Sequence, residues 1–343
     1  MKKNKRIILS YDYELFFGER SGTVLKSIIE PTNKLIEVME QIGFRGNFFV
    51  DYLMFRELEK VKEERAQADL ALLKEQIRNM VRRGHRVELH LHPHWIDAKY
   101  NGDGTWNFDD FTHYSLSSLD EETIVSMFKE GTEYLNGLCR EIEPDYKIVA
   151  FRAGGWAVQP FDKLKKGFEA SGIKIDSSTS LGAYSTKENQ GYDFRVMPEK
   201  EIYRFSDDVC KEDEKGQFVE VPISSVHLPI ILYLRDVAYL RKGTDLFNTM
   251  ADGTHVRRND YNNRSKGNVF ERIAKLCRSD FKIMLNCSAL SILSLWYMKK
   301  AMRKNQILCF IDHPKDYCEA SKCGIDYLEK HYMSINYCDL IKR

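Results

Sequence analysis

Short runs of β-forming residues alternate with helical patterns along most of this sequence, and this alternation limits the fold more than any other feature. The runs lie at residues 6–11, 46–50, 87–92, 147–152, 173–176, 218–222, 282–289 and 307–311. Apolar residues at helical spacing occupy residues 31–42, 66–83, 119–142, 160–171 and 291–305 between them. Strands separated by helices pair in parallel through crossover connections. The sequence therefore predicts an α/β protein with a closed or nearly closed (β/α) barrel.

The length of the chain and the absence of linkers favour one domain. Seven or eight strands spread over 343 residues suit a barrel better than an open sheet. The sequence contains no internal repeat and no low-complexity linker. We therefore expect a single domain over residues 1–343, with insertions near residues 96–118 and 228–266.

Charge, hydropathy and cysteine usage exclude several classes of protein. A formal net charge of +1 argues against a general nucleic-acid binder. The apolar run near the N-terminus is too short for a secretory signal, and no stretch of about 18 uncharged apolar residues predicts a membrane span. The eight cysteines have no paired spacing, as expected for reduced, buried thiols. These features predict a cytoplasmic protein.

Three histidines stand at alternate positions where the third strand-like run ends. His90, His92 and His94 would share one face of an extended strand, where their imidazoles could converge on one metal ion. A lone histidine would more often be a surface or hydrogen-bonded core residue. Three within five residues favour a metal site, and histidine-rich ligation suits zinc better than magnesium or calcium.

Other polar residues follow strand-like runs elsewhere in the chain. Asp12 and Glu14 end the first run, Arg152 precedes a Gly-Gly turn, and Asp176 and His313 end two later runs. Each of these positions alone is a weak signal, because charged residues are common at strand ends. Active sites of (β/α) barrels form at the carboxyl ends of the strands, so we expect these side chains to meet in one pocket.

Taken in order, five segments resemble the five motifs of the polysaccharide deacetylase superfamily, carbohydrate esterase family 4. The segments are SYDYE, GHRVELHLHPH, FRAGG, IDSS and FIDHP. The resemblance implies a distorted or incomplete seven-stranded barrel, with His90 and His94 as metal ligands. The family's second aspartate falls at Tyr13, so either Glu14 or His92 would supply the third ligand, or fewer protein groups would hold the metal.

The resemblance also implies an activity, namely metal-dependent removal of an N-acyl group, such as acetyl, from an amino sugar in cell-surface polysaccharide or glycoconjugate biosynthesis. Asp12 would be the general base and Arg152 would orient it. His313 would protonate the leaving amine, with Asp176 orienting the imidazole. Two alternatives stay open: deformylation or other C–N hydrolysis on the same fold, and a catalytically retired member that only binds glycans.

The substrate-binding residues are less constrained by the sequence. Trp95, Trp156 and the Gly154-Gly155 turn are candidates, although aromatic residues more often pack an insertion onto its barrel. A nucleotide- or lipid-linked sugar would carry a diphosphate, which basic residues of the second insertion could bind. The favoured interpretation is that these residues only form a solvated loop. These residues are Arg257, Arg258, Arg264 and Lys266. Residues 230–240 could form a helix that lies on a membrane surface, but a helix packed against the core is the favoured interpretation.

Overall fold

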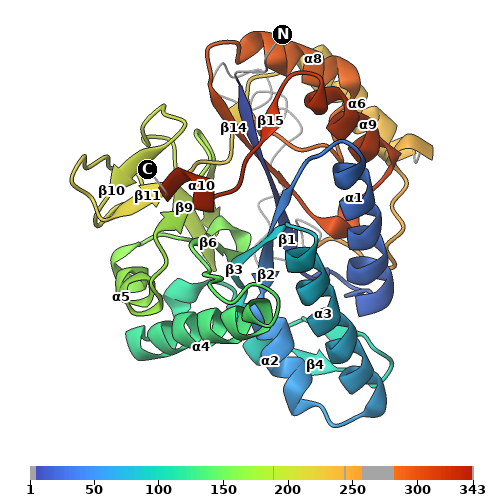
Figure 1. The fold of residues 1–343 in the computed structure, drawn as a ribbon, viewed down its shortest axis with the longest axis vertical. Coiled ribbons are helices and arrows are strands. Elements are labelled where there is room, and N and C mark those ends of the chain that lie inside the picture. Colours follow the sequence, from blue (N-terminus) through green and yellow to red (C-terminus); the bar gives the residue numbers. More distant parts are fainter. Residues whose placement is uncertain (1–4, 188, 243–244, 257–281, 342–343) are drawn as a thin grey trace.

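A nine-stranded sheet runs through the centre of the computed structural model, which describes residues 5–187, 189–242, 245–256 and 282–341 (Figure 1). Its strand order is β10-β11-β7-β6-β3-β2-β1-β14, with β15 beside β1. The strands are β1 (Arg6–Tyr13), β2 (Gly46–Asp51), β3 (Arg86–Leu91), β6 (Ala150–Ala153), β7 (Ile175–Asp176), β10 (Tyr203–Phe205), β11 (Phe218–Glu220), β14 (Ile307–Asp312) and β15 (Met333–Ser334).

The strands from β11 to β14 along this path are mutually parallel, and β10 is antiparallel to β11. The two edges of the parallel part approach each other. Ser224, just after β11, donates its N–H to the carbonyl of Cys309 on β14 at 2.9 Å, and the Cys309 N–H donates to the Ser224 hydroxyl at 2.9 Å. The sheet therefore curls into a distorted barrel whose edges meet through irregular backbone. The alternation of strands and helices predicts a nearly closed barrel, and the family resemblance implies its distortion.

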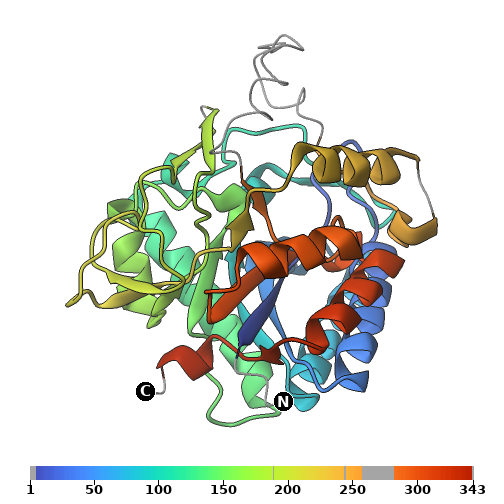
Figure 2. The same cartoon turned by 90° about the horizontal axis from the view of Figure 1, so that it is seen from above.

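Helices cover the outer face of this curled sheet (Figure 2). They are α1 (Glu30–Gln41), α2 (Tyr52–Lys60), α3 (Glu64–Arg82), α4 (Glu121–Arg140), α5 (Asp162–Ser171), α6 (Ile230–Lys242), α8 (Ile292–Ala301) and α9 (Glu319–Glu329). The short helix α10 (Cys338–Ile341) packs instead against the inner apolar cluster that contains Ile8. Short hairpins join β4 (Lys99–Tyr100) to β5 (Trp106–Asn107) and β8 (Tyr184–Lys187) to β9 (Gln190–Asp193). The strands β12 (Ser225–Val226) and β13 (Ile283–Met284), which are distant in sequence, form a third antiparallel pair. No helix among the described residues is long and apolar enough to cross a membrane.

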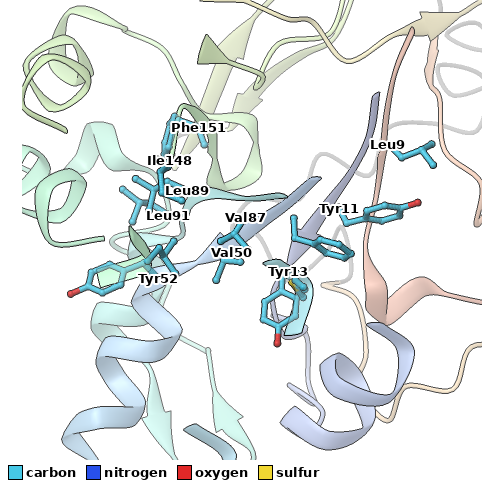
Figure 3. Packing of buried hydrophobic residues seen from close by; sticks show 14 of the residues in the cluster. Leu9, Tyr11, Tyr13, Val50, Tyr52, Val87, Leu89, Leu91, Ile148 and Phe151 are labelled. Carbon is cyan, nitrogen blue, oxygen red and sulfur yellow. The ribbon is translucent and has the colours of Figure 1, made fainter. Parts of the chain in front are cut away.

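Successive side chains along each strand point to opposite faces of the sheet, one beneath the helices and one inside the barrel. On β1, Leu9, Tyr11 and Tyr13 point into the large core beneath the helices, whereas Ile8 belongs to a smaller cluster on the other face (Figure 3). Asp12 has the same parity as Ile8 and therefore lies on the inner face of the curl. The fold thus places the polar ends of the strands above a small apolar layer inside the barrel.

Two sequence expectations differ from the structure or cannot be compared with it. Residues 282–289 were expected to form a strand, but only Ile283–Met284 pairs as β13, outside the main sheet. Further backbone bonds of this segment go to Ser224 and Ile311, so it helps to close the barrel without forming a regular strand. The basic residues expected to bind a diphosphate, Arg257, Arg258, Arg264 and Lys266, lie outside the described residues.

Candidate active site

Three metal-binding donor groups meet where β1 and β3 end. The Glu14 carboxylate oxygen Oε2 lies 3.0 Å from His90 Nε2 and 2.8 Å from His92 Nε2. All three side chains are buried, and their donor atoms lie within 4.8 Å of one another. Two imidazoles and one carboxylate form a typical protein ligand set for a catalytic zinc ion. These separations approach the distance of about 3.3 Å between ligands of a tetrahedral ion with 2.0 Å bonds.

The hydrogen bonding of His90 tests whether a cation fits there. Its Nδ1 lies 2.7 Å from the backbone carbonyl of Arg152, which can only accept, so Nδ1 carries the proton. In a neutral ring, Nε2 would then direct a lone pair at a carboxylate. A cation between them, or a second proton on the ring, removes that repulsion. A backbone carbonyl behind a histidine is also the usual partner of a metal-ligating imidazole.

The carboxylates near His90 also favour a second proton on its ring. Burial lowers the pKa of His90, but Asp12 and Glu14 outweigh it and raise that pKa to about 9. A site that attracts a proton this strongly also attracts a metal ion, because both are cations competing for one lone pair. The residues present therefore fit a divalent metal held by Glu14, His90 and His92.

Lys315 supplies a permanent positive charge beside this group, and sequence reasoning missed it. Its ammonium lies 2.8 Å from Glu14 Oε1 and donates to the Leu15 carbonyl at 2.7 Å, with only 3% of the residue exposed. Burial raises the pKa of Glu14, but Lys315 and His92 outweigh that effect, and the net pKa is well below the usual value. Glu14 is therefore ionised, with Oε2 facing His90 and His92 and Oε1 lying 3.6 Å from His313 Nε2.

Asp12 is the second carboxylate of the site. Arg152, fully buried, donates from Nη1 to Asp12 Oδ1 at 2.7 Å and is itself held by the Ser10 hydroxyl and the Ser177 carbonyl. Burial raises the pKa of Asp12, yet the Arg152 guanidinium and neighbouring imidazoles outweigh it, so the net pKa is lowered. The other oxygen, Oδ2, lies 3.8 Å from His313 Nε2. Asp12 thus presents an ionised oxygen toward an imidazole.

His313 is oriented by a carboxylate close to it in sequence. Its Nδ1 lies 3.1 Å from Asp316 Oδ2, while the other Asp316 oxygen contacts His255 Nε2 at 2.6 Å. Burial lowers the pKa of His313, but the hydrogen bond to Asp316 outweighs it and the net pKa is raised. Asp316 therefore holds the position that the resemblance assigns to Asp176.

Asp176 is placed on the other face of the sheet. It pairs with Phe151 on β6, whose ring packs against Phe128 and Phe168 of the surrounding helices. Its carboxylate accepts from the Ser178 N–H and hydroxyl. The structure therefore does not bring Asp176 to His313, because the two-residue strand β7 turns the acid outward.

His94 is not among the gathered donors. Its ring lies between Phe17, Phe108 and Phe111, and its Nε2 is 3.1 Å from the Phe108 carbonyl. Burial and the neighbouring His92 lower the pKa of His94 to about 4, so it is neutral. The structure supports His92 and Glu14 as the partners of His90, where the resemblance implied His94.

The candidate substrate-binding residues have different surroundings. Trp95 is fully buried and donates its indole N–H to Asp51 at 2.6 Å, so it supports the barrel wall. A side chain at Gly154 would come within 2.7 Å of the His92 ring, so this position must be glycine for the ring to lie there. Gly155 has a φ of 57°, in the left-handed region. Trp156 lines a cavity of about 470 Å³ together with Tyr184, Tyr192 and Tyr233.

Comparisons with known proteins give similarity of fold alone. No protein-family model and no curated protein sequence matches this chain. A Mycobacterium smegmatis structure described as a polysaccharide deacetylase is 14% identical, with a TM-score of 0.46, over 96% of this chain and 84% of that one. A 4-alpha-glucanotransferase from Thermococcus litoralis is 12% identical, with a TM-score of 0.47, over 100% of this chain and 41% of that one. A Bacillus cereus polysaccharide deacetylase is 10% identical, with a TM-score of 0.37, over 97% and 93%.

Proposed function

We propose that this chain is a metal-dependent hydrolase that removes an N-acyl group, such as acetyl, from an amino sugar. The observation that carries the proposal is the joint placement of three donors, Glu14, His90 and His92, beside the ionised Asp12 and the oriented His313. Amide hydrolysis requires carbonyl polarisation, a base for the attacking water and an acid for the leaving amine. The resemblance of the five sequence segments supports the choice of an amino sugar.

The roles of the side chains follow from their contacts. When bound, a divalent cation polarises the amide carbonyl and makes water more acidic. Asp12 takes the proton of the attacking water on Oδ2, because Arg152 occupies Oδ1 and keeps the carboxylate ionised. His313 gives a proton to the departing nitrogen, and Asp316 holds its Nδ1–H and so directs Nε2 toward the reaction.

The test is hydrolysis of a panel of amino sugars by protein loaded with zinc, cobalt or manganese. The panel contains N-acetyl and N-formyl forms of nucleotide-linked sugars, lipid-linked sugars and oligosaccharides, and release of acetate or formate is measured. We expect turnover that is lost in Asp12→Asn and retained in Glu220→Gln, a buried acid of the same rim on the opposite face. Turnover that is equal in both variants would contradict the proposal.

The Lys315–Glu14 ion pair favours a second candidate, hydrolysis of a C–N bond without a metal. In this case Lys315 would take over charge stabilisation, and the three donors would only form a hydrogen-bonded cluster. Chelator-treated protein separates the two candidates. Full turnover after metal removal favours the second candidate, whereas activity restored in proportion to added metal favours the first. Absence of turnover with every substrate and metal would leave a glycan-binding role.

A further inference from the structure

The surface formed by α6 and α8 is unusually apolar for an exposed face. Eight of the fourteen large apolar side chains that are exposed among the described residues lie on these two helices, so their distribution is far from even. We call the six that lie in the N-terminal half of either helix the α6–α8 face. Its members are Ile230, Ile231, Leu234, Ile292, Leu293 and Trp296, each between 38% and 74% exposed. Contiguous apolar side chains of this kind mark an interaction site.

The face is held in place by polar contacts between the two helices. Arg235 on α6 hydrogen-bonds to the Ser291 hydroxyl, and the Ser294 hydroxyl donates to Asp236 at 2.6 Å. On the inner side of α8, Leu295 and Met298 are fully buried. Leu295 and Met298 are outnumbered by the exposed apolar side chains of α8, so burial in the core does not account for the apolar character of this helix. The polar contacts hold its exposed apolar side in a fixed position.

A basic groove adjoins the face at Trp296. It is lined by Lys5, Trp296, Lys299, Lys300, Arg303, His331 and Tyr332, without an acidic residue among them. The Lys300 ammonium lies 5.6 Å from the centre of the Trp296 ring. Lysines beside a tryptophan and aliphatic residues match the boundary of a lipid bilayer, where phosphate headgroups lie just above the acyl chains.

We propose that the α6–α8 face and this groove dock the protein onto a membrane surface that contains anionic lipids. The aliphatic side chains and Trp296 enter the acyl boundary, and Lys299, Lys300 and Arg303 contact headgroup phosphates. The positive charge of the groove favours an anionic lipid surface as the partner. A second copy of this chain is disfavoured, because two positively charged grooves would repel each other. The inner side of α6 lines the 470 Å³ cavity through Tyr233, Val237 and Leu240, so docking brings that cavity next to lipid.

Vesicle flotation tests the docking with the full chain. Vesicles of phosphatidylcholine alone are compared with vesicles that also contain phosphatidylglycerol. We expect flotation with the anionic vesicles, weakened by salt, and a blue shift of tryptophan fluorescence on vesicle addition. Trp95 and Trp106 are buried, so the shift would come from Trp296, with any part that remains in Trp296→Ser due to Trp156 in the cavity.

Two variants and two matched controls locate the contact. Leu293→Ser with Trp296→Ser should lower vesicle binding more than tenfold, because it removes two side chains from the acyl boundary. Lys299→Gln with Lys300→Gln should lower it about fivefold per lysine on anionic vesicles only. Val196→Ser, at an 82% exposed position off the face, and Lys34→Gln on α1 should leave binding unchanged.

Three outcomes would overturn the proposal. The first is failure to float with either vesicle, and the second is equal binding by the face variants and their controls. The third is a dimer that dissociates in the Leu293→Ser, Trp296→Ser variant, which would assign the face to a second copy of the chain. Each variant is first checked for an unchanged thermal transition, so that loss of binding cannot reflect unfolding. Hydrolase activity is not used as a readout, so the test is independent of the proposed function.

Discussion

Two groups of buried acids lie at the same rim of the barrel and behave in opposite ways. Glu14 faces inward and contacts the Lys315 ammonium and two imidazoles, and its pKa is lowered despite its burial. Asp176 and Glu220, paired across β7 and β11, face the helices. Their partners are hydroxyl and N–H groups of Ser178 and Thr179.

The second pair therefore holds its protons more tightly than free carboxyl groups do. Burial raises the pKa of both acids, and for Glu220 the neighbouring Asp176 raises it further. Both groups are equally hidden from water, so burial does not explain the difference. The charge of the neighbours decides which acid is ionised. An ionised buried carboxylate can hold a metal or accept a proton, whereas a protonated pair contributes structure.

The largest expected difference is between removing the charge of Glu14 and making the same change at Glu220. In Glu14→Gln we expect metal affinity to fall by more than about 100-fold, because one donor is lost. The unfolding free energy should fall by about 3–5 kcal/mol, because Lys315 is left buried without a counter-charge. Calorimetric zinc titration and urea denaturation measure the two quantities. The matched change Glu220→Gln should leave metal affinity intact and cost under about 1 kcal/mol, since burial and the neighbouring Asp176 raise the pKa of Glu220 and so favour its neutral form. Equal losses in both would contradict the comparison.

The next effect concerns turnover alone. Asp12→Asn should lower kcat by about 10²–10⁴-fold, because an amide cannot accept the proton of water. Metal content should not change, since Asp12 is not among the three donors. Steady-state kinetics and elemental analysis on the same sample provide the check. An Asp12→Asn variant that loses its metal would instead make Asp12 a ligand.

The protonated pair should leave a signature in the pH dependence of stability. The pKa of Glu220 is raised above its unfolded value of 4.5, so the folded protein holds a proton that the unfolded chain releases above that pH. The contribution to stability is complete below pH 4.5 and is lost as the pH rises through the folded pKa. Urea denaturation from acidic to alkaline pH should show this decline in the wild type and a smaller one in Glu220→Gln. Parallel curves would mean that the pair is ionised.

The smallest effect distinguishes two neighbouring histidines. His94→Gln should change metal affinity less than about threefold and cost about 1 kcal/mol, the typical value of one lost hydrogen bond. His92→Gln should lower metal affinity at least tenfold, because Nε2 of His92 faces Glu14. Zinc titration of both variants measures the contrast. Strong loss of metal from His94→Gln would restore the ligand set implied by the resemblance.

Regular periodicity explains what the sequence could predict. Strand and helix spacing indicated the parallel barrel, and strand ends located Asp12, Arg152, His90 and His313 at one rim. Alternate residues share one face only within the strand, so this pattern does not predict the direction of side chains after the strand ends. β3 ends at Leu91, and Pro93 begins a 3₁₀ turn (Pro93–Asp97), so His94 no longer shares the face of His90.

Residues that depend on tertiary contacts could not be predicted in the same way. The facing of Asp176 depends on the register of a strand of only two residues. Asp316 and His255 are neighbours only because a distant loop folds over the last strand end. Lys315 did carry a sequence signal, since it follows His313 by two positions. Its burial could be recognised only once Glu14 was placed beside it.

Lys315 also bears on how the proposed metal would reach its site. The acidic pocket has its own counter-ion, attached to the polypeptide 301 residues away from Glu14. If the proposed metal binds here, the barrel can assemble first and be loaded afterwards, because the charge of Glu14 is already balanced without the metal. A chain of this kind would tolerate metal scarcity as an inactive but intact reserve, and would regain activity without new synthesis.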